Sequence, residues 1–283
     1  MSAPEFDTQP LREVLGPSAV GGGRRRFFDL LLLISVTDFK KTYFETALGY
    51  VWSLIRPLIL FAVLLFVFTQ IFRIGSQVEN YPVLLLLNIV VFGFFQEATM
   101  AAVGSVVGRE GIVRKTQFPR LVIPLSTVLT SFFNLCLNLV VVLVFLLAFQ
   151  VEPTWTWLLF PVAILLLMVI TTAVSMIVSV LYVRFRDVSI IWTLLATVLF
   201  YATPVLYPIE AVPEQYGFLI RINPLTPIFE QMRTWVVDPS APGALTSAGG
   251  WLGLLPAIAI FASVCVIAVW LFRREAPRIA EDL

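Results

Sequence analysis

The sequence predicts an all-α membrane protein with six transmembrane helices. Of its 283 residues, 59% are hydrophobic and only 13% are charged, whereas soluble domains are about 45–50% apolar and about 25% charged. The mean hydropathy is +0.93, and the apolar residues gather in runs long enough to cross a bilayer. The net charge of +1 provides no overall field that would attract nucleic acid. This composition excludes a soluble enzyme, a disordered chain and a nucleic-acid binder.

Several kinds of chemistry are absent from the sequence. The chain has no histidine, which excludes histidine–metal sites and histidine-activated nucleophiles. Cys136 and Cys265 lie inside apolar runs, where we expect inert packing residues rather than a disulfide framework or a zinc site. No GxxxxGK[ST] loop is present, so the chain cannot hydrolyse ATP by the common P-loop route. We therefore expect no catalytic residue, no metal and no cofactor bound by this chain.

The first 49 residues precede the predicted spans. Residues 1–23 show no periodic apolar pattern and are expected to form a flexible cytoplasmic tail. Residues 24–49 are predicted to form an amphipathic helix in the cytoplasmic interface. One face of its helical wheel carries the apolar residues Phe28, Leu32, Val36, Phe39 and Tyr43. A packed cytoplasmic helix is the alternative; a signal peptide is a weaker one, because no small-residue cleavage site follows the short apolar run.

Six apolar runs then form a transmembrane domain over residues 50–272. The predicted spans are residues 50–72, 82–107, 121–149, 156–183, 188–207 and 249–272. Fifteen of the 19 Lys and Arg residues lie in the N-terminal 49 residues, in the second and fourth connections, or in the tail 273–283, whereas three lie on the other side. The positive-inside rule therefore places both termini, including that short tail, in the cytoplasm.

The connection between the fifth and sixth spans, residues 208–248, is predicted to face outside and to contain two short re-entrant helices. The first covers residues 212–222 and ends at Asn223-Pro224. The second begins at Thr226-Pro227, an N-cap hydroxyl followed by a proline suited to the first helical position. Glu230 and Arg233 are expected on its polar face. Such backbone persists at membrane depth only where protein or water surrounds it.

Three polar residues lie inside the predicted spans. Glu97 is the only carboxylate well inside a span, and an intramembrane acid marks a functional site by default. A hydrogen bond between helices is an equally good interpretation of Glu97. Asn134 and Asn138 lie four residues apart on one face of the third span. We interpret these two amides as helix-packing groups rather than as ligands of a substrate.

Five short motifs occur in a familiar order along residues 40–275. They are LGYVWSLIRP at 48–57, RKTQFPR at 114–120 followed by Pro124-Leu125, RFRD at 184–187, Pro204-Val205 with Tyr207, and NPLTP at 223–227. Together these motifs resemble the ABC-2 type permeases that export polysaccharides and polyol phosphates, such as O-antigen and teichoic acid exporters. The first motif is the most specific of the five.

The resemblance implies a homodimer that works with two copies of a separate cytoplasmic ATPase, which binds the ATP and magnesium. Residues 108–120 would contain the coupling helix that docks on the ATPase, and the RFRD loop would make a second contact. The residues implied in ATPase coupling are Glu110, Arg114, Lys115, Phe118, Arg120, Arg186 and Asp187. For the three basic residues of the first loop, the alternative is a purely topological role.

The resemblance also assigns two ends of a substrate path. The cytoplasmic opening, where the pyrophosphate of a lipid-linked glycan would bind, contains Arg56, Tyr50, Trp52, Lys40 and Lys41. An arginine that snorkels to lipid headgroups is the alternative for Arg56. The external gate contains Tyr207, Asn223, Glu230 and Arg233. Spans one and five would line a pore at the dimer interface.

The implied function is that of the transmembrane subunit of an exporter in the bacterial inner membrane. Its cargo would be a polysaccharide linked to polyprenyl pyrophosphate, of the O-antigen, teichoic acid or cell-wall galactan type. An ABC-2 exporter of a drug or lipid is the first alternative. An ion-coupled carrier is a second, although a single buried acid and the lack of an evident repeat disfavour it. A membrane-embedded transferase lacks candidate catalytic residues.

Overall fold

The computed structural model describes residues 23–44, 49, 51–73, 78, 80–111 and 120–275. Within these ranges every regular element is a helix, which confirms the all-α prediction. The longer helices are α1 (Gly23–Phe44), α2 (Val51–Phe66), α3 (Tyr81–Val103), α5 (Val122–Ala148), α6 (Phe160–Arg184), α7 (Val188–Ala202) and α11 (Trp251–Glu275). The short α-helices are α8 (Glu214–Arg221), α9 (Thr226–Met232) and α10 (Ala244–Ser247).

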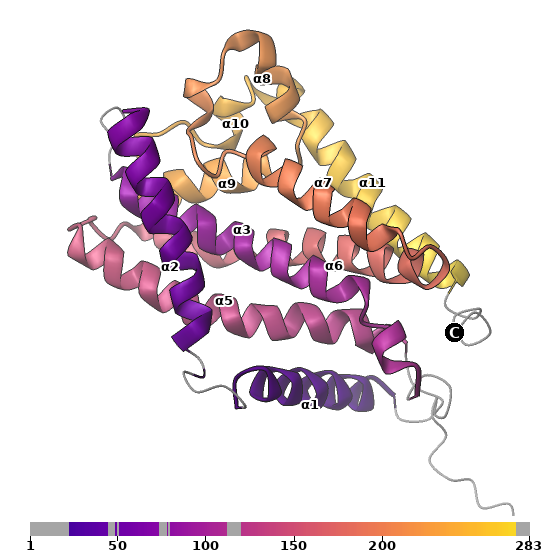
Figure 1. Cartoon of the computed structure of the whole chain (residues 1–283). Helices are drawn as coiled ribbons and strands as arrows, with labels where there is room; N and C mark the ends of the chain where they lie inside the picture. The colour runs from indigo at the N-terminus through magenta and orange to yellow at the C-terminus, as the bar shows by residue number, and fades with distance from the viewer. Residues whose placement is uncertain are drawn as a thin grey trace, which may run out of the picture.

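Helix α3 forms the centre of the molecule, between α5, α6, α2 and α7 (Figure 1). Apolar residues lie on every side of this helix, which suits a helix surrounded by other helices. Tyr81, Leu85, Phe92 and Phe95 are among the largest fully buried side chains of the described residues. Helix α11 packs against α6, and α2 crosses the other long helices steeply (Figure 1). The core therefore forms around α3, and α2 leaves most of its surface uncovered.

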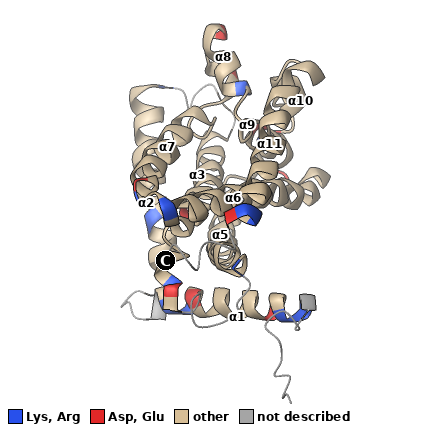
Figure 2. Cartoon of the chain, turned by 90° about the vertical axis from the view of Figure 1, so that its right-hand side faces the viewer, with Lys and Arg blue, Asp and Glu red and all other residues tan. Residues whose placement is uncertain are grey.

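Among the described residues, five helical stretches are long and apolar enough to cross a membrane. They are Val51–Ile71, Tyr81–Val103, Val122–Ala148, Trp155–Arg184 and Trp251–Glu275. The first combines α2 with a π-helix (Val67–Ile71), and the fourth begins with a 3-10 helix (Trp155–Leu159) before α6. These five correspond to the predicted first, second, third, fourth and sixth spans. Charged residues gather on α1, on α8 and at helix ends, and the helix middles are almost free of them (Figure 2).

The predicted fifth span is shorter than expected. Helix α7 has 15 residues and ends at Ala202, so it extends about 22 Å against a hydrocarbon core of about 30 Å. The predicted end at Tyr207 is wrong because Pro204 forces Thr203 out of helical geometry, to φ −100° and ψ 145°. The count of six spans therefore stays a prediction.

The backbone after α7 is irregular but satisfied by side chains of α3. The Tyr81 hydroxyl donates to the Leu206 carbonyl oxygen at 2.7 Å. The Asn88 amide donates to the carbonyl oxygens of Pro204 and Val205, both at 3.2 Å. Buried carbonyl groups need such donors where water is excluded. Two polar side chains of the central helix thus hold the chain where α7 stops.

Helix α1 runs alongside the first half of α5 (Figure 1). The Ser35 hydroxyl donates to the Ser126 carbonyl oxygen at 3.2 Å, and the Thr130 hydroxyl donates to the Ser35 carbonyl oxygen at 3.3 Å. The first part of the predicted apolar face is uncovered, with Phe28 and Leu32 exposed by 56% and 51%, whereas Phe39 packs edge-on against Phe133 of α5. That uncovered face is compatible with an interfacial helix, whose position in the membrane stays a prediction. The tails, residues 1–22 and 276–283, lie outside the described residues.

Residues 203–250, named the cap segment below, connect α7 to α11 and contain both predicted short helices. They are α8 and α9, and α9 continues into a π-helix, Arg233–Val237. The predicted N-cap role of Thr226 is wrong. Leu225 occupies the N-cap position, and the Thr226 hydroxyl donates to the Ile220 carbonyl oxygen at 2.7 Å. The re-entrant placement of these helices in a membrane stays a prediction.

Candidate functional site

A cavity of about 900 Å³ lies between α2, α3, α5 and α7, and Thr42 of α1 also lines it. This volume is in the range of small-molecule sites. Its charged and amide-bearing lining residues are Arg56, Gln96, Glu97, Asn134 and Asn138. The steep crossing of α2 over α3 places Arg56 opposite Glu97 and the two asparagines. The structure thus brings together residues that the sequence assigned to two separate groups.

Glu97 is exposed to the cavity and is held from behind by α5. The Asn134 amide donates to Glu97 Oε1 at 2.5 Å, and the Ser131 hydroxyl donates to the same oxygen at 3.4 Å. Asn134 and Ser131 are both buried. Hydrogen bonds to a carboxylate are stronger than those between neutral groups, so these two donors fix the orientation of Glu97.

Arg56 provides the only positive charge among the described residues that line the cavity. Its side chain is exposed, and its positive charge attracts the Glu97 carboxylate. Helix α2 carries Pro57 next to Arg56, and a proline inside a helix leaves one backbone carbonyl without its usual donor. Trp52 lies one turn before Arg56 and also lines the cavity. The cytoplasmic-opening residues Arg56 and Trp52 therefore share one site.

Of the remaining predicted opening residues, the two lysines do not line the cavity. Lys40 and Lys41 are exposed on α1, and neither is among the cavity-lining residues. Tyr50 lies outside the described residues. The rest of the described cavity wall is mostly apolar and includes Phe92, Phe94 and Phe200. A carboxylate, a guanidinium and amides set in an aromatic wall can bind a ligand that has both hydrogen-bonding groups and apolar faces.

Asn138 lies one turn beyond Asn134 on α5, and its amide donates to the Asn134 carbonyl oxygen at 2.9 Å. Both asparagines line the cavity, so they share a face as predicted. Ser131 completes the set and was not singled out in the sequence. Its position three residues before Asn134, on the same helical face, is the signal that could have found it.

The described residues expected to contact an ATPase lie at helix ends. Glu110 follows the 3-10 helix Val107–Arg109, and Arg120 lies two residues before α5. Arg186 and Asp187 are exposed between α6 and α7, and the Arg186 guanidinium lies 5.0 Å from the Tyr182 ring centre. Arg114, Lys115 and Phe118 lie outside the described residues. Docking of an ATPase at these positions stays a prediction.

An ion pair that was not predicted from the sequence lies beside the first predicted ATPase contact. Arg109 forms a salt bridge with Asp38 of α1 and donates to the Ser126 hydroxyl of α5 at 2.9 Å. The side chains of Arg109 and Asp38 are exposed by 20% and 35%. Thr42, one turn after Asp38, lines the cavity. This pair therefore connects the end of the α3 region to the helix that reaches the cavity.

The cap segment contains a second cluster of charged residues. The Arg233 guanidinium donates to both carboxylate oxygens of Glu210, at 3.0 and 2.9 Å. Arg233 also lies 3.7 Å from Glu230 and 3.9 Å from Asp238. The polar face predicted for Glu230 and Arg233 is wrong, because both are buried. Neighbouring parts of the cap segment cover that side of α9.

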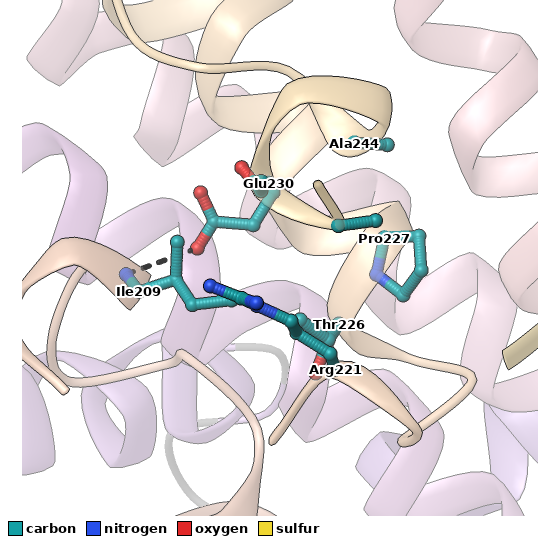
Figure 3. Close-up of a pocket in the computed structure, with 8 residues that line it drawn as sticks. Ile209, Arg221, Thr226, Pro227, Glu230 and Ala244 are labelled. Carbon is teal, nitrogen blue, oxygen red and sulfur yellow. Dashed lines mark hydrogen bonds between the residues drawn. The ribbon is translucent and has the colours of Figure 1, made fainter. Parts of the chain in front are cut away.

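Glu230 lies beside a small hollow of about 10 Å³, room for roughly one water molecule (Figure 3). Its Oε1 accepts a hydrogen bond from the Ile209 backbone N–H at 3.3 Å. Burial raises the pKa of Glu230 to about 7, and the nearby Glu210 carboxylate adds to this, whereas Arg233 and the Ile209 N–H oppose it. The hollow is too small for an organic ligand, so this cluster holds the cap segment together.

Tyr207 and Asn223, the other two predicted gate residues, also make internal contacts. The Tyr207 hydroxyl donates to the Tyr201 carbonyl oxygen at 2.7 Å. The Asn223 amide donates to the Thr203 hydroxyl at 2.8 Å, and its Oδ1 accepts from the Leu225 N–H at 3.0 Å. The Tyr207 bond, together with a bond of 3.3 Å from the Asn223 amide to the Ala202 carbonyl oxygen, attaches the cap segment to the end of α7. A gating role for the four residues stays a prediction.

Comparisons with known proteins agree with this architecture. An O-antigen export system permease protein RfbA of Klebsiella pneumoniae is 33% identical over 199 residues, which cover 70% of this chain and 76% of that protein. The Myxococcus xanthus protein of the same name is 26% identical over 260 residues, covering 90% and 95%. The polysialic acid transport protein KpsM of Escherichia coli is 23% identical over 234 residues, covering 81% and 87%. Residues 29–236 match the family model of ABC-2 type transporters, and the chain therefore belongs to the ABC-2 type transporter family.

Proposed function

We propose that this chain is the transmembrane subunit of an exporter that moves a polysaccharide linked to polyprenyl pyrophosphate across the bacterial inner membrane. The names of the similar proteins, two O-antigen export permeases and a polysialic acid transport protein, support export of a polysaccharide. The single observation that carries the proposal is the cavity between α2, α3 and α5, because it joins one guanidinium and one oriented carboxylate to an aromatic wall.

Each kind of lining residue has a part in this function. Arg56 binds the pyrophosphate of the lipid carrier, since a guanidinium donates to two phosphate oxygens at once. The aromatic residues Trp52 and Phe200 pack against the apolar faces of sugar rings. Amide groups such as Gln96 exchange hydrogen bonds with sugar hydroxyls. The chain performs no covalent chemistry in this mechanism, and ATP hydrolysis takes place in a separate subunit.

We infer that two copies of the chain form the transport path. Helices α2 and α7 support this arrangement, because their exposed residues are almost all apolar and include Val63, Phe66, Ile190 and Leu194. Two ATPase subunits would contact the cytoplasmic connections, residues 108–120 and 184–187. Both termini would lie on that side of the membrane.

Reconstitution tests the proposal. The chain and its cognate ABC ATPase are placed in proteoliposomes that contain polyprenyl-pyrophosphate-linked glycan, and exposure of the glycan on the far side is measured with a membrane-impermeant lectin. We expect translocation that requires ATP and disappears with a hydrolysis-deficient ATPase. ATP-driven movement of a fluorescent drug or a phospholipid, without movement of any glycan, would favour the drug or lipid exporter instead. Translocation driven by an ion gradient without the ATPase would favour a secondary carrier.

A further inference from the structure

The charges of the cavity are balanced. Among the described residues that line it, Arg56 is the only cation and Glu97 the only anion. Arg56 of α2 and Glu97 of α3 line the same cavity, so their opposite charges offset one another there. When Arg56 binds a pyrophosphate, the ligand neutralises the Arg56 charge. Glu97 then presents an uncompensated negative charge to the sugars that follow the pyrophosphate.

Glu97 is arranged to accept hydrogen bonds from a ligand. Ser131 and Asn134 both donate to Oε1. Within the described parts of the chain, no hydrogen bond to Oε2 is found, and the residue is exposed to the cavity. A carboxylate oxygen accepts strongly from hydroxyl groups, because hydrogen bonds to an ionised acceptor are about twice as strong as those between neutral groups. The geometry therefore presents one anionic acceptor to the passing polymer.

We propose that Glu97 determines the charge class of the exported polymer, so that the cavity accepts an uncharged glycan and disfavours an acidic one. This inference rests on the proposed function. An uncharged sugar donates its hydroxyl protons to Glu97 Oε2 and packs on the aromatic wall. A carboxylated sugar brings a second anion beside Glu97, and the cavity contains no further cation among its described lining residues to offset it.

The test compares two donors in the same proteoliposomes, an uncharged hexose polymer and a polymer with one carboxylate per repeat, both on polyprenyl pyrophosphate. For the wild type we expect the uncharged polymer to be translocated at least about tenfold faster, equivalent to about 1.4 kcal/mol. In Glu97→Gln, which keeps the shape and removes the charge, we expect this ratio to fall to about threefold or less. A structural role would slow both donors equally and leave the ratio unchanged.

A second variant keeps the test informative if the Glu97→Gln protein fails to fold. Gln96→Glu adds a carboxylate to the same cavity and should raise the ratio above that of the wild type. An unchanged ratio in both variants, or a wild type that translocates the acidic polymer equally fast, would overturn the assignment of Glu97 while leaving glycan export intact. Translocation of neither polymer by a complex with active ATPase would refute the proposed function itself.

Discussion

Glu97 in the cavity and Glu230 in the cap segment are both carboxylates near an arginine, but their surroundings differ. Glu230 is 2% exposed, and the neighbouring Arg233 is shared with Glu210 and Asp238. Glu97 is fixed through one oxygen and open to the cavity through its exposed side. Buried charges that bind one another stabilise a fold only as a complete set, whereas charges that face a cavity remain available to a ligand. The two regions therefore use the same residue types for different purposes.

The largest expected effect comes from removing the arginine of the cap segment. Arg233→Met leaves Glu230, Glu210 and Asp238 without their shared cation, and breaking a buried ion pair costs about 3–5 kcal/mol. The matched control is Arg25→Met, an exposed arginine of α1 for which we expect a change within about 0.5 kcal/mol. Thermal unfolding of the purified proteins in detergent measures both. Equal melting temperatures for the two variants would contradict a structural role for the cluster.

The second effect is a pH dependence of the cap segment. The pKa of Glu230 is about 7 in the folded protein and 4.5 is its ordinary value, so between these values the folded state binds more protons than the unfolded state. Stability should therefore rise as the pH falls from about 7 towards about 4.5, by at most roughly 3 kcal/mol. Melting temperatures at pH 5.5 and pH 8 test this in the wild type and in Glu230→Gln. The extra stability at pH 5.5 should be smaller in Glu230→Gln than in the wild type. An equal gain in both proteins would show that another group causes the pH dependence.

The salt bridge between Asp38 and Arg109 should give an intermediate effect, because both side chains are partly exposed. Arg109→Met removes this pair and the hydrogen bond to Ser126, and we expect a loss of about 1 kcal/mol. A charge swap, Asp38→Arg combined with Arg109→Asp, should recover most of the stability that each single change loses. Additive losses in the double variant would show that the two charges do not interact.

Hydropathy predicted most of the fold because the length of an apolar run is a property of local sequence. It placed five spans within a few residues of the observed helices. It failed at α7, where the effect of Pro204 on Thr203 outweighed continued apolarity. It also assigned Glu230 and Arg233 to a polar surface, because a helical wheel does not reveal which neighbouring segments will cover it.

The candidate site was only partly predictable. Arg56, Glu97, Asn134 and Asn138 stood out as polar groups in apolar runs. Their meeting in one cavity depends on the steep crossing of α2 over α3, which periodicity does not encode. The Asp38–Arg109 pair was not predicted, because charged residues near helix ends are common in membrane proteins and the sequence does not reveal which partners they bind. Long-range pairing of side chains was the information that the sequence alone lacked.

Arg56 should give the smallest effect on stability. It also provides the most direct test of the cavity as the substrate site. Its side chain is exposed to the cavity, so Arg56→Gln should change the free energy of unfolding by less than about 0.5 kcal/mol. ATP-driven translocation of the lipid-linked glycan by this variant, with Arg56→Lys as the control that keeps the charge, is the decisive measurement. We predict at least about a tenfold loss for Gln and a smaller loss for Lys. Translocation by the Gln variant at the wild-type rate would contradict the assignment of the cavity as the substrate site.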